Sequence, residues 1–238
     1  MVNYIYKHCD KILCASPSFV PKIQERVTNK DKVIYWPQYS TVQKTDEVVE
    51  LFDKDNFNIV FTGNIGEAQG IDIAIEAANI LKNEKICWHF IGEGRNREKL
   101  MDMVSKYGIS DKVKFYGFHP ETEIPKYLSN ADAALLILKP NPVFEMTIPA
   151  KLQTYLACGV PILGCVSGEG KRIIEESGAG IVSDSVSVND LVKVCQTFNK
   201  LDDNELDSYK IQAYNYGEKN FSKLNLIKKL EILMEDLR

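Results

Sequence analysis

Short apolar runs alternate with helical patterns over most of the chain. From residue 57 onward the runs that read as strands are FNIVFTG, KICWHFIGEG, KVKFYGF, AALLILK, PILGCV and AGIVS. Between the first two, one helical stripe collects Ile71, Ala74, Ile75, Ala78 and Leu81. Strands that are apolar throughout are typical of a parallel sheet with helices on both faces. We therefore predict an α/β fold built on a doubly wound, Rossmann-like parallel sheet.

The two ends of the chain differ from this regular middle. The runs KILCAS (11–16) and KVIYW (32–36) flank a helical pattern and predict a strand–helix–strand unit. Residues 37–56 are polar without sustained periodicity, which is typical of a linker or hinge. Helical patterns over roughly 188–201, 204–220 and 222–237 finish the chain.

Composition narrows the class of protein. The chain has 238 residues, 45% of them hydrophobic, which is enough for one large domain or one domain and a fragment of another. Its net charge of −4 gives no general attraction to nucleic acid. The six cysteines form no C-x-x-C pair and no secretory signal precedes them, so we expect reduced thiols and a cytoplasmic protein. DKD (53–55) reads as a solvated turn, and we expect no metal.

A glycine-rich loop, GNIGEAQG (63–70), follows the first strand of the regular region. Glycines let backbone approach a ligand closely and offer unobstructed amides, and Asn64 and Gln69 add neutral hydrogen bonds. The spacing differs from the dinucleotide fingerprint, and a tight turn without ligand fits it equally well. The run GEG (92–94), after the next strand, is a second and weaker candidate for a glycine loop that contacts a ligand.

The segment EMTIPAKLQTYLACG (145–159) is the strongest candidate for an anion site. Thr147 is placed to cap a helix, Pro149 fits its first turn, and Lys151 follows closely. Free amides and the positive end of the helix dipole suit a diphosphate, and Lys151 supplies the cation that the glycine loop lacks. A solvated lysine is the alternative. The neighbouring Gln153 and Thr154 favour the anion site.

Taken in order, FTGNIGEAQGID, FIGEG, KFYGFHPETEIPKYLSNADAAL and TIPAKLQTYLACGVPIL resemble one half of a known family. They resemble the nucleotide-sugar-binding half of GT-B-fold retaining glycosyltransferases of family four, as found in bacterial capsule and O-antigen assembly. The resemblance covers about 57–200, which it implies to be a Rossmann-like donor-binding domain. Residues 1–40 resemble the tail of the preceding acceptor domain, leaving 41–56 as a linker and 201–238 as C-terminal helices.

The resemblance implies sugar transfer from a nucleoside diphosphate sugar, UDP-linked, to a saccharide or lipid-linked acceptor with retention. It implies no cofactor, a cytoplasmic enzyme, and an N-terminal acceptor domain outside this chain that carries any attachment to the inner membrane face. This chain alone is then expected to be inactive. The implied role of Lys151 is to stabilise the departing diphosphate. The implied donor-binding residues are Gly63, Asn64, Ile65, Gly66, Gln69, Gly92, Glu93, Phe118, His119, Glu145, Thr147, Ile148, Pro149, Gln153 and Thr154.

One departure from the family pattern leaves other functions open. Two carboxylates spaced E-x7-E contact sugar and ribose in the family, but here those positions hold Met146 and Thr154. A shifted pair, Glu145 and Gln153, is conceivable. Neutral contacts are weaker than the charge-assisted ones they replace. The alternatives are a UDP-sugar 2-epimerase of similar architecture and a non-catalytic nucleotide-sugar-binding or scaffold subunit.

Overall fold

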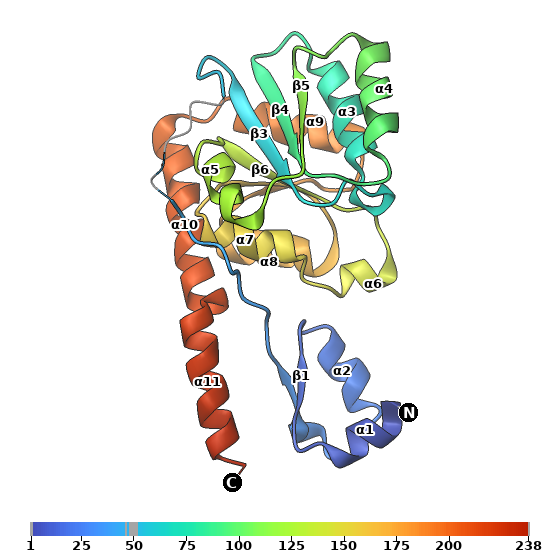
Figure 1. The fold of residues 1–238 in the computed structure, drawn as a ribbon, viewed down its shortest axis with the longest axis vertical. Coiled ribbons are helices and arrows are strands. Elements are labelled where there is room, and N and C mark those ends of the chain that lie inside the picture. The colour runs from blue at the N-terminus through green and yellow to red at the C-terminus, as the bar shows by residue number, and fades with distance from the viewer. Residues whose placement is uncertain (1, 46, 48–51, 238) are drawn as a thin grey trace.

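The computed structural model describes residues 2–45, 47 and 52–237 and contains one main sheet of six parallel strands (Figure 1). Its spatial order is β5-β4-β3-β6-β7-β8. The strands are β3 (Phe57–Thr62), β4 (Ile86–Ile91), β5 (Val113–Gly117), β6 (Ala133–Ile137), β7 (Ile162–Cys165) and β8 (Gly180–Val182). The predicted doubly wound α/β fold is confirmed. The strand order reverses between β3 and β6, and sheets of this kind bind ligands beside that point.

Helices bury both faces of this sheet. On one face lie α3 (Ile71–Ile80), α4 (Arg97–Tyr107) and α9 (Val188–Phe198). On the other lie α5 (Ile124–Ser129), α7 (Ala150–Ala157), α8 (Gly168–Ser177) and α10 (Asp203–Phe221). Successive strand residues enter opposite cores, as Val60 and Phe61 of β3 do. This two-sided burial explains why most residues of the strands are apolar.

The N-terminal residues form a small strand–helix–strand unit outside the main sheet. It consists of α1 (Val2–His8), β1 (Ile12–Cys14), α2 (Phe19–Gln24), the 3₁₀ turn η1 (Lys30–Lys32) and β2 (Val33–Tyr35), and β1 and β2 pair in parallel apart from the main sheet (Figure 1). Glu169 at the start of α8 connects the unit to the main body. Its carboxylate accepts from the Ser18 amide at 3.2 Å and from Arg172 at 2.8 Å, although only 5% of Glu169 is exposed.

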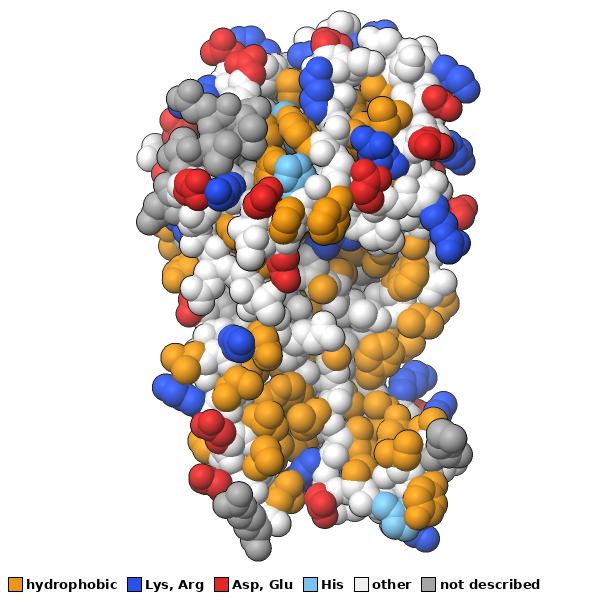
Figure 2. Space-filling model, in the orientation of Figure 1, with side chains coloured by type: hydrophobic (Ala, Val, Ile, Leu, Met, Phe, Trp, Pro, Cys, Tyr) orange, Lys and Arg blue, Asp and Glu red, His pale blue; other side chains and the backbone are white. Residues whose placement is uncertain are grey.

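Exposed apolar side chains gather on this unit and on α11 (Lys223–Glu235), in the lower part of Figure 2. They include Tyr4, Ile5, Leu13, Leu224 and Ile232. Among the described residues, no helix is long and apolar enough to cross a bilayer. Part of the predicted linker, Asp46 and Val48–Leu51, lies outside the described residues.

A buried histidine anchors the edge of the sheet away from the glycine loops. The His89 ring on β4 contacts Asn58 of β3 through Nε2 at 3.0 Å and the Tyr116 hydroxyl of β5 through Nδ1 at 2.9 Å. Burial, helped by the charge of Lys114, lowers the pKa of His89 to about 4. The ring is therefore neutral at pH 7, and it holds three strands together through both nitrogens.

We predict that His89 makes the folded state acid-sensitive. The unfolded chain protonates this residue near its ordinary pKa of 6.5, whereas the folded chain does so only near 4. The stability it contributes is therefore fully present above pH 6.5 and falls as the pH drops toward 4, by about 3 kcal/mol. Urea unfolding at pH 7 and 4.5 measures the loss. His89→Gln should lose less stability over the same interval, and equal losses in both proteins would contradict this account.

Candidate functional site

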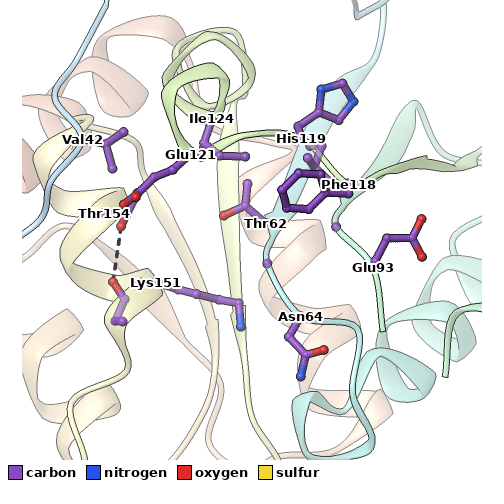
Figure 3. Close-up of a pocket in the computed structure, with 14 residues that line it drawn as sticks. Val42, Thr62, Asn64, Glu93, Phe118, His119, Glu121, Ile124, Lys151 and Thr154 are labelled. Atoms are coloured by element: carbon purple, nitrogen blue, oxygen red, sulfur yellow. Dashed lines mark hydrogen bonds between the residues drawn. The ribbon is translucent and has the colours of Figure 1, made fainter. Parts of the chain in front are cut away.

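A cavity of about 440 Å³ opens at the carboxyl ends of β3, β4 and β5, facing α7 (Figure 3). It lies beside the position where the strand order reverses. Each of these three strands contributes the loop that follows it, and α7 contributes the opposite wall. The lining residues are Val42, Thr62, Gly63, Asn64, Ile91, Gly92, Glu93, Phe118, His119, Glu121, Ile124, Ala150, Lys151 and Thr154.

The glycine loops hold each other in place. The Gly63 amide donates to the Ile91 carbonyl at 2.8 Å, and the Gly92 amide donates to the Gly117 carbonyl at 2.7 Å. A Cβ on Gly92, whose φ is 143°, would lie 1.9 Å from the Gly63 carbonyl oxygen. Any side chain at position 92 would therefore push the first loop away, so glycine is required there by contact as well as by backbone conformation.

These contacts correct one expectation about the first loop. Gly63 and Ile65 do not offer their amides to a ligand, because the Ile65 amide likewise donates to the Glu93 carbonyl at 2.8 Å. The amides of Asn64 and Gly66 have no acceptor among the described residues. Gly63 has a φ of 113°, which favours glycine, and a Cβ there would also lie 3.0 Å from Cε of Lys151. A glycine at this position lets the lysine reach the loop.

Lys151 crosses the cavity from α7 to the glycine loop. Its Nζ donates to the Gln69 side-chain oxygen at 2.5 Å and lies 4.8 Å from the centre of the Phe61 ring. No carboxylate among the described residues forms an ion pair with it. Burial lowers the pKa of Lys151 to about 8. The ammonium is thus largely charged at pH 7, and no described residue supplies the anionic partner that a buried charge needs.

The helix that carries Lys151 begins differently from the prediction. Pro149 occupies the N-cap position, so α7 starts at Ala150 without a side-chain cap. The expectation that Thr147 caps this helix is wrong, because its hydroxyl donates to the Val143 carbonyl at 2.7 Å, in the turn after α6 (Pro142–Glu145). The uncapped first amides of α7 therefore remain available at the cavity wall.

Two rings line the wall beyond β5. Phe118 is 74% exposed, although it belongs to the lining of the cavity. The ring of His119 is held by Glu123 at 2.8 Å and by the Tyr127 hydroxyl at 3.1 Å. A large exposed aromatic face beside a fixed ring is suited to stacking on a planar ligand group.

A carboxylate that the sequence analysis missed faces α7. Glu121 lies in the 3₁₀ turn η3 (Glu121–Glu123) and extends across the cavity toward Thr154 (Figure 3). The Thr41 hydroxyl donates to it. Val42, the next connector residue, is 7% exposed and lines the same cavity. The polar segments around these residues carry no pattern that would have marked them.

The structure divides the predicted site residues into three groups. Those that meet in the cavity are Gly63, Asn64, Gly92, Glu93, Phe118, His119, Lys151 and Thr154. Three others line a smaller cavity that also includes Lys151, and they are Gln69, Thr147 and Pro149. The remaining five line neither cavity, and they are Ile65, Gly66, Glu145, Ile148 and Gln153.

The shifted pair suggested for the E-x7-E positions is not brought together at the cavity. Glu145 accepts from the Ser167 hydroxyl at 3.1 Å, beside the start of α8. Gln153 is 3% exposed and lies on the buried side of α7. The helical turn places Thr154, rather than Gln153, toward the cavity, which removes the physical basis for this pair.

The family model for glycosyl transferases group 1 matches residues 42–216. The chain belongs to this family. The resemblance predicted from the order of its motifs is therefore confirmed.

The relatives of this chain include the probable glycosyltransferase WbjE of Pseudomonas aeruginosa, 27% identical over 76% of this chain and 47% of WbjE. Another is the putative colanic acid biosynthesis glycosyl transferase WcaI of Escherichia coli, 28% identical over 63% of this chain and 39% of WcaI. The chain thus spans about half the length of these curated relatives.

Solved structures share the fold at low sequence identity. Anabaena Alr3699/HepE, solved in complex with UDP and glucose, superposes with a TM-score of 0.78 at 14% identity, over 99% of this chain and 65% of that one. WaaG, a glycosyltransferase involved in lipopolysaccharide biosynthesis, superposes with a TM-score of 0.71 at 16% identity over 90% of this chain and 60% of WaaG. The group 1 domain therefore has the architecture of one half of a GT-B enzyme.

We predict that anion binding in this group 1 domain weakens as Lys151 loses its proton. UDP, the anionic probe, is about nine-tenths ionised at pH 7 and more so above it, since a terminal phosphate has a second pKa of about 6. The lysine has a pKa of about 8. Affinity for UDP should therefore fall about tenfold between pH 7 and 9. Calorimetry at both values measures the fall, and Lys151→Met provides the control, in which the affinity should be lower and nearly independent of pH. An equal pH dependence in both proteins would refute a contact between Lys151 and the anion.

Proposed function

We propose that this chain is the donor-binding half of a retaining glycosyltransferase. It transfers a sugar from a UDP-sugar to a saccharide or lipid-linked acceptor in surface polysaccharide biosynthesis. One observation carries the proposal. The ammonium of Lys151, which pairs with no carboxylate of the described residues, meets the glycine loop at the cavity beside the reversal of strand order. Relatives of the family act in polysaccharide assembly, and several structural neighbours were solved with UDP, which supports this choice of donor.

The proposed diphosphate site combines three kinds of donor. Lys151 contributes a full charge, the start of α7 contributes amides and the dipole, and the first loop contributes the amide of Asn64. During transfer the bond between C1 of the sugar and the diphosphate oxygen breaks, and a bond from C1 to the acceptor hydroxyl oxygen forms. The hydroxyl proton leaves with the UDP. Fixed donors at the oxygen where negative charge develops lower the barrier.

The nucleoside is assigned to the β5 side of the large cavity. The exposed ring of Phe118 offers a stacking face for the base, beside the fixed ring of His119. Glu121 offers a carboxylate to the ribose hydroxyls, in the way that acidic residues hold ribose in other Rossmann-like folds. The family pattern places the ribose-binding carboxylate at position 154, which is a threonine in this chain. Glu121, which accepts from Thr41 and faces Thr154, provides a carboxylate for the ribose in its place.

The N-terminal unit is proposed to be the end of an acceptor domain that completes the enzyme. A parallel pair of three-residue strands is not independently stable, and parallel strands are normally buried on both faces. Here the pair leaves Leu13 and Tyr35 exposed at 40% and 36%. An α/β domain that adds strands to this pair would cover them and place an acceptor opposite the donor cavity.

Lys151 should matter more for turnover than for donor binding. In a protein in which this chain is joined to its acceptor domain, Lys151→Ala is expected to lower kcat by about 100-fold, because the lysine contacts the charge that grows in the transition state. The affinity for UDP-sugar should fall by about tenfold or less. Initial rates with radiolabelled donor and calorimetry separate the two effects. Unchanged turnover would remove Lys151 from the mechanism, and interconversion of UDP-sugar epimers without an acceptor would favour the epimerase.

Glu121 should determine recognition of the ribose. We expect Glu121→Gln to weaken UDP binding about tenfold, because a charge-assisted hydrogen bond becomes a neutral one. Inorganic pyrophosphate lacks a ribose, so its affinity should be the same for both proteins and serves as the matched control. Titration of each protein with both ligands tests the assignment. A parallel loss of pyrophosphate binding would mean that the substitution disturbs the whole site.

A further inference from the structure

A second cavity, of about 240 Å³, adjoins the donor cavity on the far side of Lys151. The two cavities share Ala150 and Lys151, so the proposed diphosphate position is their common boundary. The other residues that line the second cavity are Gln69, Leu136, Ile137, Leu138, Phe144, Thr147 and Pro149. A nucleoside diphosphate sugar is a linear molecule with its diphosphate in the middle. A nucleoside on the Phe118 side therefore leaves the sugar on this side.

The lining of the second cavity is unusual for a sugar site because it is mostly apolar. Six of its side chains are hydrocarbon, from Leu136, Ile137, Leu138, Phe144, Pro149 and Ala150. Its two neutral polar side chains already have partners. The Gln69 oxygen accepts from Lys151 at 2.5 Å, and the Thr147 hydroxyl donates to the Val143 carbonyl at 2.7 Å.

This lining discriminates between sugars by simple physical chemistry. A sugar hydroxyl placed against hydrocarbon loses its hydrogen bonds to water and regains few. A methyl group placed there gains from burial of apolar surface. The cavity therefore disfavours a fully hydroxylated hexose on the side that it covers and favours a sugar with a methyl group at that position.

We propose that the second cavity receives the transferred sugar and selects one that carries a methyl group, either a 6-deoxy sugar or an N-acetylated sugar. This rests on the proposed function, because it takes the diphosphate to bind at Lys151. Phe144 determines the specificity, since it is the aromatic side chain that the described lining contains and comes from the short helix α6 between β6 and α7.

The test compares four ligands on the intact chain by ligand-observed NMR titration. They are UDP, UDP-glucose, UDP-6-deoxyglucose and UDP-N-acetylglucosamine. At least one methyl-bearing donor should bind about tenfold more tightly than UDP-glucose, the low end of the discrimination that a hydrophobic pocket achieves when a ligand gains or loses one small group such as a hydroxyl. If UDP binds and UDP-glucose binds as tightly as both methyl-bearing donors, this inference is wrong while the proposed function stands. If UDP itself does not bind, both are wrong.

Substitutions at two aromatic residues localise the effect. Phe144→Ser should reduce the affinity ratio between methyl-bearing donor and UDP-glucose to near one, and Phe144→Leu should restore most of it. Phe118→Ser, in the first cavity, should lower the affinity for all four ligands by the same factor and leave the affinity ratio unchanged. Thermal melting confirms that each variant is folded. A ratio that survives Phe144→Ser, or that falls equally in Phe118→Ser, would overturn the assignment of this cavity to the sugar.

Discussion

The buried ammonium of Lys151 is the constraint on which the rest of the site depends. A positive charge held against the Phe61 ring and the Gln69 side-chain oxygen, with no carboxylate partner among the described residues, is costly to keep in place. Burial has already lowered its pKa to about 8. An anionic ligand would remove this cost. The glycine at position 63 and the position of α7 both serve to bring this charge to the end of β3.

The sheet explains why the charge and the loops meet. Parallel strands place the loops that follow β3, β4 and β5 at one edge, and α7 crosses the same edge after β6. Hydrogen bonds between the loops then fix their spacing, and they occupy the Gly63 amide, which is therefore not available to a ligand. Lys151 also separates two cavities of different character. One has an aromatic face and a carboxylate, and the other is lined mainly by hydrocarbon.

Much of this arrangement could be predicted from residue patterns, because it follows from local rules. Apolar strands alternating with helices specify the doubly wound sheet, and the sheet places Gly63 and Lys151 at one edge. The features that were predicted wrongly or missed depend on tertiary contacts instead. Thr147 does not cap α7, because a short helix before it takes the hydroxyl and Pro149 occupies the cap. The Gly63 amide cannot bind a ligand because it donates to the end of β4, and no local sequence pattern shows this pairing. Glu121 reaches the cavity through the packing of its turn, against a connector that looks featureless in sequence.

A crystal structure of this chain with UDP tests the central claim most directly. The account predicts that Nζ of Lys151 leaves the Gln69 oxygen and lies about 2.7–2.9 Å from an oxygen of the terminal phosphate, the usual length of a charge-assisted hydrogen bond. The base should then stack on Phe118, and the smaller cavity should remain open beyond the terminal phosphate. UDP bound elsewhere on the molecule, with Lys151 still bonded to Gln69, would contradict it.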